Sequence, residues 1–277
     1  MKAMRTDLGE AFGTKKAKKA IRSEAENAVL GQNSEKLNRG EQVMMGSIKD
    51  AARGMATREE LQALIDDARP VPRANLEADE IQDVYRPADM IGYEVLNAIP
   101  VLDWQEKVQS SDEVLVSSRY VANRIVRVAS NEDAVQRLKV MRYLLFVLIF
   151  WGTARQGKER GTWSVGKRDQ LREAMSPAPE MVIENIRRRF SDQGVMRKTH
   201  RDLLMTHCCA FASIIDNFEV NMMDLREDLK LEQKELNQYF MEIGARIKQS
   251  KSGDKISHIA KLELPLQFPK IRQIRRK

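Results

Sequence analysis

The stretch DLREDLKLEQKELNQYFMEIGARIKQ, residues 224–249, decides between a bundle of long helices and a fold edged by a β-hairpin. Leu225 and Leu229 define one apolar stripe at helical spacing. A second stripe begins at Leu236 and does not continue the phase of the first. Leu231, between the two stripes, is expected to plug a tight turn. The stretch therefore predicts two short helices rather than one rod.

The residues that follow predict a two-stranded ribbon. Gly244 is expected to end the second helix, and Asn221 to cap the first. The polar segment SKSGDK, residues 250–255, lies between two strand patterns and predicts a hairpin tip. Helix, turn, helix and ribbon form the plan of a winged helix. One face of the second strand is expected to carry Ala260, Leu262, Leu264, Leu266 and Phe268.

Two such units are expected along the chain. NEDAVQRLKVMRYLLFVLIFW, residues 131–151, predicts a long buried helix capped by Asn131, and Gly152–Gly166 a loop. The proline-containing segment SPAPE, residues 176–180, ends the preceding helical pattern and predicts a domain boundary. The expected fold class is mainly α with small β-ribbons (α+β), as tandem winged-helix domains preceded by a partly helical linker. The segments are a basic linker (1–78, with helical patches at 15–30 and 58–68), a first winged-helix domain (79–176), a second (177–270) and a basic tail (271–277).

Composition favours an anionic partner inside the cell. The chain of 277 residues has a net charge of +7 and a pI of about 9.3. Its longest apolar run, YLLFVLIFW at 143–151, falls well short of the ~20 residues that span a bilayer. The N-terminus shows no apolar signal-peptide region, and the two cysteines are adjacent. These features predict an intracellular, reducing environment without a disulfide framework.

Two sequences resemble most of a phosphate-binding loop. GTARQGKE at 152–159 and GTWSVGKR at 161–168 both contain G-x-x-x-x-G-K. Each lacks the following Ser or Thr that would hold Mg²⁺, having Glu159 or Arg168 instead. Nucleotide binding is therefore not expected, and a glycine-rich, basic loop is the preferred interpretation.

Metal binding and catalysis are likewise not expected. His200, His207, Cys208 and Cys209 are close in sequence, but neighbouring cysteines point about 100° apart on a helix and no second ligand pair exists. A buried, apolar role is preferred for the cysteines. The sequence shows no nucleophile beside a plausible base, so no cofactor or small-molecule substrate is predicted.

The candidates for DNA contact are polar and basic residues at positions where a winged helix meets phosphates. Glu232 and Glu235 on the second helix are expected to repel phosphate, which favours backbone contacts over base readout. The candidates are Lys15, Lys16, Lys18, Lys19 and Arg22 in the linker, Lys230, Lys234 and Gln238 at the second helix, Arg246, Lys248, Lys251 and Lys255 in the ribbon, and Lys270 and Arg272 in the tail.

The sequence resembles the family of forty-nine-kilodalton-type subunits of RNA polymerase I over its linker and tandem winged-helix region. The resemblance rests on LGEAFGTKKAKKAI at 8–21, ADMIGYEVLNAIPVLDW at 88–104 and DNFEVNMMDLREDLKLEQKELNQYFMEIGARI at 216–247. It implies a winged-helix region similar to that of the TFIIE beta subunit. It also implies a non-catalytic polymerase subunit in the nucleus and nucleolus, which binds double-stranded DNA and supports initiation and elongation on ribosomal RNA genes. Implied partners are RNA polymerase I core subunits and initiation factors, without a membrane.

The resemblance leaves two matters open. Family members carry an N-terminal β-rich dimerisation domain, and nothing strand-like precedes residue 8, so the sequence is expected to be a fragment or to have lost that domain. A scaffold that docks only other proteins of a polymerase or initiation complex is the alternative function. Salt-dependent binding to random duplex DNA separates the two, and strong preference among duplexes would instead indicate a sequence-specific transcription factor.

Overall fold

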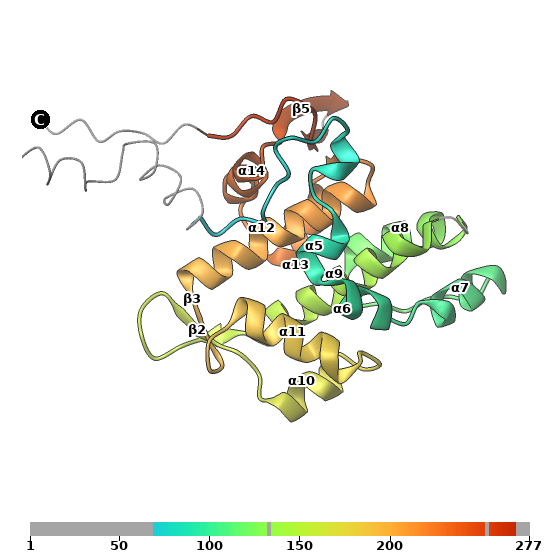
Figure 1. The fold of residues 1–277 in the computed structure, drawn as a ribbon, viewed down its shortest axis with the longest axis vertical. Coiled ribbons are helices and arrows are strands. Elements are labelled where there is room, and N and C mark those ends of the chain that lie inside the picture. Colours follow the sequence, from blue (N-terminus) through green and yellow to red (C-terminus); the bar gives the residue numbers. More distant parts are fainter. Residues whose placement is uncertain (1–68, 132–133, 253–254, 270–277) are drawn as a thin grey trace, which may run out of the picture. The chain divides into compact units, whose positions relative to one another are not determined.

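The structure, a computed structural model, describes residues 69–131, 134–252 and 255–269, and these are mainly helical with two small sheets (Figure 1). The chain divides into two compact units, Met1–Arg69 and Pro70–Lys277. All the helices and strands given below belong to the second unit. The predicted linker helices at 15–30 and 58–68 and the basic tail lie outside the described residues. The expected fold class, mainly α with small β-ribbons, is confirmed.

Short helices come first in the second unit. Gly92, at φ 101°, separates the first two α-helices, and Ser118 caps the fourth by accepting a hydrogen bond from the Val121 N–H at 3.1 Å. The elements are a 3-10 turn η2 (Ile81–Asp83) and helices α5 (Pro87–Ile91), α6 (Tyr93–Ala98), α7 (Leu102–Gln109) and α8 (Arg119–Ala129).

The rest of the unit repeats one order of elements: long helix, strand, short helix, helix, strand. The two long helices contain 19 and 18 residues, and both short helices contain 7. The first copy is α9 (Val135–Thr153), β2 (Thr162–Ser164) with its partner β1 (Arg155–Gln156), α10 (Arg168–Ala174), α11 (Glu180–Phe190) and β3 (Val195–Arg197). The second copy is α12 (Lys198–Ile215), β4 (Glu219–Asn221), α13 (Met223–Leu229), α14 (Gln233–Glu242) and β5 (Arg246–Ser252), followed by β6 (Lys255–Lys261).

Two antiparallel sheets flank the helices. Sheet A has the order β1-β2-β3, and sheet B has the order β4-β6-β5. In sheet A, Trp163 of β2 is paired with Met196 of β3. All three strands of sheet A belong to the first copy, and β3 leads directly into α12, the first helix of the second copy. The predicted boundary at residue 176 falls between these paired strands, and the division into domains 79–176 and 177–270 stays a prediction.

The core is centred on α9 and α12, which pack against each other. Both helices bury side chains on nearly all sides, as expected for helices in the middle of a fold. The ring of Tyr143 meets Phe211 edge-on at 5.4 Å, and its hydroxyl donates to Asn185 Oδ1 at 2.7 Å. In the part of the chain that the structure describes, no helix has the length and apolar character to cross a bilayer.

The predicted break at Leu231 is confirmed. Helix α13 ends at Leu229, Lys230 takes a left-handed conformation at φ 55°, and α14 begins at Gln233. Leu231 is 8% exposed, so it fills the turn as expected. Gly244 follows α14 with φ 87°, a conformation that favours glycine at a helix end.

The hairpin after α14 is also confirmed, but its second strand is shorter than predicted. The register runs from Arg246↔Lys261 to Ser252↔Lys255, and β6 ends at Lys261. The alternation beyond this point does not form a strand, because Pro265 has no backbone N–H to donate to a ladder. Instead, the Gln267 N–H donates to the Gly244 carbonyl at 3.3 Å, and Leu264 and Phe268 are each 37% exposed.

Three further expectations were wrong: two helix caps and one loop. Helix α9 begins at Val135 with Ala134 at its N-cap, so Asn131 does not cap it. The predicted loop from Gly152 to Gly166 contains the β1–β2 hairpin, because pairing with β3 stabilises strands too short to recognise by alternation. The N-cap of α13 is Met222, one residue after the predicted Asn221, whose Oδ1 accepts from the Met223 N–H at 3.1 Å.

An ionic cluster fixes α8 against the second copy. Arg124 donates through Nε to Asp216 at 2.8 Å and through Nη1 to Asp224 at 2.9 Å. The Asp216 carboxylate also accepts from the Tyr120 hydroxyl at 2.9 Å. The side chains of Arg124 and Asp216 are only 10% and 6% exposed, so each depends on the other for compensation of its charge.

Asp216→Ala is expected to lower the free energy of unfolding by about 3 kcal/mol, because it leaves the buried Arg124 charge without its main partner. Urea denaturation monitored by circular dichroism measures this change. Glu180→Ala removes one partner of the exposed ion pair with Arg172 and should leave the midpoint nearly unchanged. An equal effect of both substitutions would contradict the role given to the cluster.

The buried His207 is expected to make the stability of the protein depend on pH. Its ring lies edge-on to Phe190 at 5.3 Å, and Nδ1 lies 2.8 Å from the Leu203 carbonyl, to which it donates. Burial lowers the pKa of His207 from 6.5 to about 3. Between these two pH values the unfolded chain binds a proton that the folded chain does not. Stability is therefore expected to fall as the pH decreases from about 6.5 toward 3.

From pH 7 to pH 5, His207 should cost about 2 kcal/mol of unfolding free energy, and His207→Leu should remove that part of the pH dependence. Denaturant titrations of both proteins at the two pH values measure the difference. The absolute stability of the variant does not matter for this comparison. An unchanged pH dependence in the variant would show that His207 is protonated in the folded protein.

Candidate nucleic-acid interface

Helix α14 has one face in the core and one in solvent. Leu236 and Phe240 are buried, whereas Lys234, Gln238 and Met241 form an exposed stripe at helical spacing. Two of the residues predicted to contact DNA, Lys234 and Gln238, thus share the open face. Lys230, also predicted, is exposed in the turn that precedes the helix.

Of the two glutamates expected to repel phosphate, Glu235 is paired with a cation within the protein. Glu235 Oε1 accepts from Arg201 Nη2 at 2.6 Å, so a cation on α12 compensates its charge. The Tyr239 hydroxyl, one turn further on, donates to Asp202 at 2.7 Å. Glu232 remains exposed at the N-cap of α14. Of the two carboxylates expected to repel phosphate, only Glu232 is left without a cationic partner among the described residues.

Arg201 also connects α14 to sheet A. Its guanidinium lies 5.4 Å from the Trp163 ring centroid and 5.9 Å from that of Trp151, within the range of a cation–π interaction. Trp151 Nε1 donates to the Leu229 carbonyl at 3.1 Å. Arg201 was not among the predicted residues. No local pattern signals it, because its partner Glu235 lies 34 residues further along the chain.

The β5–β6 hairpin (residues 246–261) supplies a second group of cations. Arg246 and Lys261 both contact Glu263, at 2.8 and 3.1 Å. The Lys261 ammonium beside it holds the pKa of that carboxyl below its usual range. Lys248 is exposed on the same strand face as Arg246.

The remaining residues predicted to contact DNA are at the hairpin tip, in the linker and in the tail. Lys251 and Lys255 lie on paired strands close to the tip, where Ser252 is opposite Lys255. All the linker and tail candidates lie outside the described residues: Lys15, Lys16, Lys18, Lys19, Arg22, Lys270 and Arg272. The structure thus groups Lys230, Lys234 and Gln238 at α14, with Lys248 on the adjoining hairpin.

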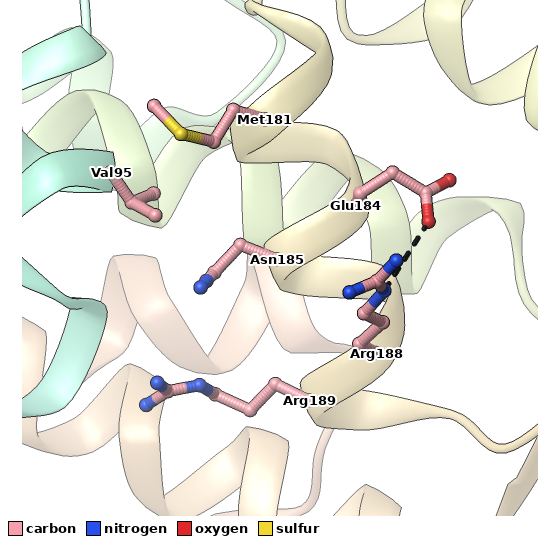
Figure 2. Close-up of a pocket in the computed structure, with 6 residues that line it drawn as sticks. All are labelled: Val95, Met181, Glu184, Asn185, Arg188 and Arg189. Atoms are coloured by element: carbon pink, nitrogen blue, oxygen red, sulfur yellow. Dashed lines mark ion pairs between the residues drawn. The ribbon is translucent and has the colours of Figure 1, made fainter.

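Helix α11 has the same place in the first copy as α14 has in the second, but α5 and α6 cover part of it. Arg189 donates to the Met90 carbonyl, and Asn185 Nδ2 donates to the Ile91 carbonyl at 3.2 Å. An open pocket of about 460 Å³ remains between α6 and α11 (Figure 2). It is lined by Val95, Met181, Glu184, Asn185, Arg188 and Arg189.

The arginines of α11 are largely engaged within the protein. Glu184 is contacted by Arg168 at 2.9 Å, by Arg187 at 3.5 Å and by Arg188 at 3.7 Å. Figure 2 shows Arg188 reaching back along the helix to this carboxylate. The α6-facing side of α11 cannot enter a DNA groove, whereas the exposed stripe of α14 is open.

The sequences that resembled other kinds of site have structural roles. The first match begins within α9, and the second contains the strand β2 itself, so neither forms a loop between a strand and a helix as a phosphate-binding loop does. His200 Nδ1 accepts from the Arg197 N–H at 3.2 Å at the start of α12.

The buried, apolar role expected for the cysteines is confirmed. Cys208 and Cys209 are fully buried, and burial raises the pKa of both thiols. Within residues 69–131, 134–252 and 255–269, no group of three or more His, Cys, Asp or Glu side chains could hold a metal ion.

Comparison with known proteins gives one consistent result. The family model of A49-like RNA polymerase I associated factors matches residues 1–269. The chain is 27% identical to a Schizosaccharomyces pombe protein named DNA-directed RNA polymerase I subunit rpa49, over 97% of this chain and 66% of that protein. It is 26% identical to the Saccharomyces cerevisiae protein named DNA-directed RNA polymerase I subunit RPA49, over 89% of this chain and 60% of that protein. The chain thus spans about two thirds or less of the length of these relatives.

Proposed function

Because this chain belongs to the family of A49-like RNA polymerase I associated factors, we propose that it is a non-catalytic part of an RNA polymerase I subunit and binds duplex DNA. In this role it supports initiation and elongation of ribosomal RNA transcription in the nucleus and nucleolus. Its partners are RNA polymerase I core subunits, initiation factors and DNA. The names of the two relatives, both RNA polymerase I subunits, support the assignment to this polymerase.

The DNA-binding part of the proposal rests on one observation: α14 exposes Lys234 and Gln238, while Glu235 is held by Arg201 on another side. A helix that follows a tight turn and precedes a hairpin is the element that a winged helix places on DNA. Lys248 on the neighbouring hairpin extends the positive charge. The wing order of α12, β4, α13, α14, β5 and β6 supports the winged-helix assignment.

Backbone contact is favoured over base readout. Lys230, Lys234 and Lys248 meet phosphates as point charges, whereas Arg246 on the hairpin is paired with Glu263. Asn237 is engaged within the helix, since its Oδ1 accepts from Gln233 Nε2 at 2.7 Å. Glu232 is exposed at the N-cap of α14 and disfavours deep entry of the helix into a groove. These features support binding without strong sequence preference.

Neutralising the hairpin by Lys248→Gln, Lys251→Gln and Lys255→Gln is expected to weaken binding to a random duplex. The slope of log affinity against log salt should become shallower by up to about 0.9 for each phosphate that the variant no longer neutralises. Fluorescence anisotropy with a labelled duplex of about 20 base pairs, titrated at several salt concentrations, measures both quantities.

A matched variant, Lys107→Gln with Lys139→Gln and Arg172→Gln, removes the same charge from α7, α9 and α10 and should change binding much less. Absence of binding by the unmodified protein even at low salt would overturn the proposal and leave a scaffold that docks only other proteins. Strong preference among duplexes of different sequence would overturn the proposed lack of specificity.

A further inference from the structure

A second basic surface lies on sheet A, in the first copy of the repeat. None of its residues is among the predicted DNA contacts, although the two sequences that resemble phosphate-binding loops overlap it. It consists of the β1–β2 hairpin (residues 155–164), β3 and the first residue of α12. Its cations are Arg155, Lys158, Arg160, Arg197 and Lys198, all exposed.

The register of sheet A shows which side chains share its outer face. Arg155 is opposite Ser164, and Thr162 is opposite Arg197, so these residues lie on one face of the sheet. The other face carries Trp163, which is half-buried, and Met196, which is buried. The outer face therefore places two arginines in solvent on either side of β2.

The tip of the hairpin is fixed by its own hydrogen bonds. The Gly157 N–H donates to the Thr162 carbonyl at 2.9 Å, and the Thr162 hydroxyl donates to the Glu159 carbonyl at 2.8 Å. A Cβ at Gly157 would lie 2.5 Å from Thr162 Oγ1, and Gly161 has φ 78°. The glycines thus serve a tight turn, and this turn displays the two cations of the tip, Lys158 and Arg160. Ordering before binding reduces the entropy cost of association.

The charge of this surface is largely uncompensated. Arg197 lies 4.0 Å from Asp192, the limit for an ion pair. Among the described residues, Arg155, Lys158, Arg160 and Lys198 have no acidic partner within that distance. Glu159 is the single acid between Arg155 and Lys167. A fixed group of unpaired cations attracts anions and is the kind of surface that binds a phosphate backbone.

The surface adjoins α14 through Arg201. Trp163 of β2 lies on the inner face of sheet A, and its ring contacts the Arg201 guanidinium. Arg201 in turn pairs with Glu235 on α14. Lys234 directly precedes Glu235 in the sequence, and its side chain belongs to the exposed stripe of α14. Sheet A and the DNA-binding helix of the proposed function are therefore linked through Arg201.

We propose that the β1–β2 hairpin, together with the start of α12, is a second phosphate-binding element that contacts the same duplex as α14. The inference rests on the proposed function, since it extends that DNA-binding surface. The ligand is the sugar–phosphate backbone of duplex DNA, and the contact carries no base recognition because it is made by charge alone.

The test is Lys158→Gln with Arg160→Gln, measured by anisotropy on the same random duplex of about 20 base pairs. The expected results are a loss of affinity of roughly tenfold or more near 50 mM salt and a salt slope shallower by up to about 1.8. The charge-preserving exchange Lys158→Arg with Arg160→Lys should retain binding. Both pairs of changes are at exposed positions, and equal urea midpoints check that the fold is unchanged.

Lys107→Gln with Lys139→Gln is the matched control, because α7 lies on the opposite side of the unit in Figure 1 and Lys139 is near the other end of α9. If the unmodified protein binds DNA and the hairpin variant behaves like this control, the inference is wrong while the proposed function stands. If the unmodified protein does not bind, the proposed function itself has failed. Equal loss of affinity in the Gln variant and in the charge-preserving variant would also contradict a role through charge.

Discussion

The packing of α9 against α12 is the constraint on which the rest of this structure depends. Each helix has apolar side chains on nearly every side, so neither is stable unless other elements cover all its faces. The contact of Tyr143 with Phe211 lies in this shared core. The two copies of the element order are consequently held together. Sheet A, formed wholly by the first copy, is joined to the second where β3 leads directly into α12.

Function follows from what this packing leaves at the surface. The packing leaves Lys234 and Gln238 of α14 exposed, together with basic residues of the two hairpins. Arg201 contacts sheet A on one side and pairs with Glu235 on the other, which removes an acidic group from the face of α14. The equivalent helix of the first copy, α11, is covered by α5 and α6 instead. The two copies therefore differ at the equivalent helix, which is covered in the first copy (α11) and exposed to solvent in the second (α14).

Local signals predicted the elements that local chemistry controls. The phase change at Leu231, the glycine at residue 244 and the alternation up to Lys261 were sufficient to place α13, α14 and the β5–β6 hairpin. Beyond Lys261 the same alternation does not form a strand, since Pro265 cannot join a ladder even where the apolar pattern continues. The strands β1, β2 and β3 have two or three residues each, too few to show a period. They exist because they pair with one another across residues 155–197.

By itself, the sequence determined a mainly helical fold with a ribbon after α14, a positive charge balance and a family resemblance, because these depend on residue types and short-range spacing. Tertiary structure decided the partner of Glu235, the pairing of sheet A and the basic face around Arg155 and Arg197. Each of these depends on residues distant in sequence meeting in space, as Arg201 and Glu235 do across 34 positions. Pairing at that separation is set by how the two long helices pack, and no local pattern of residues records it.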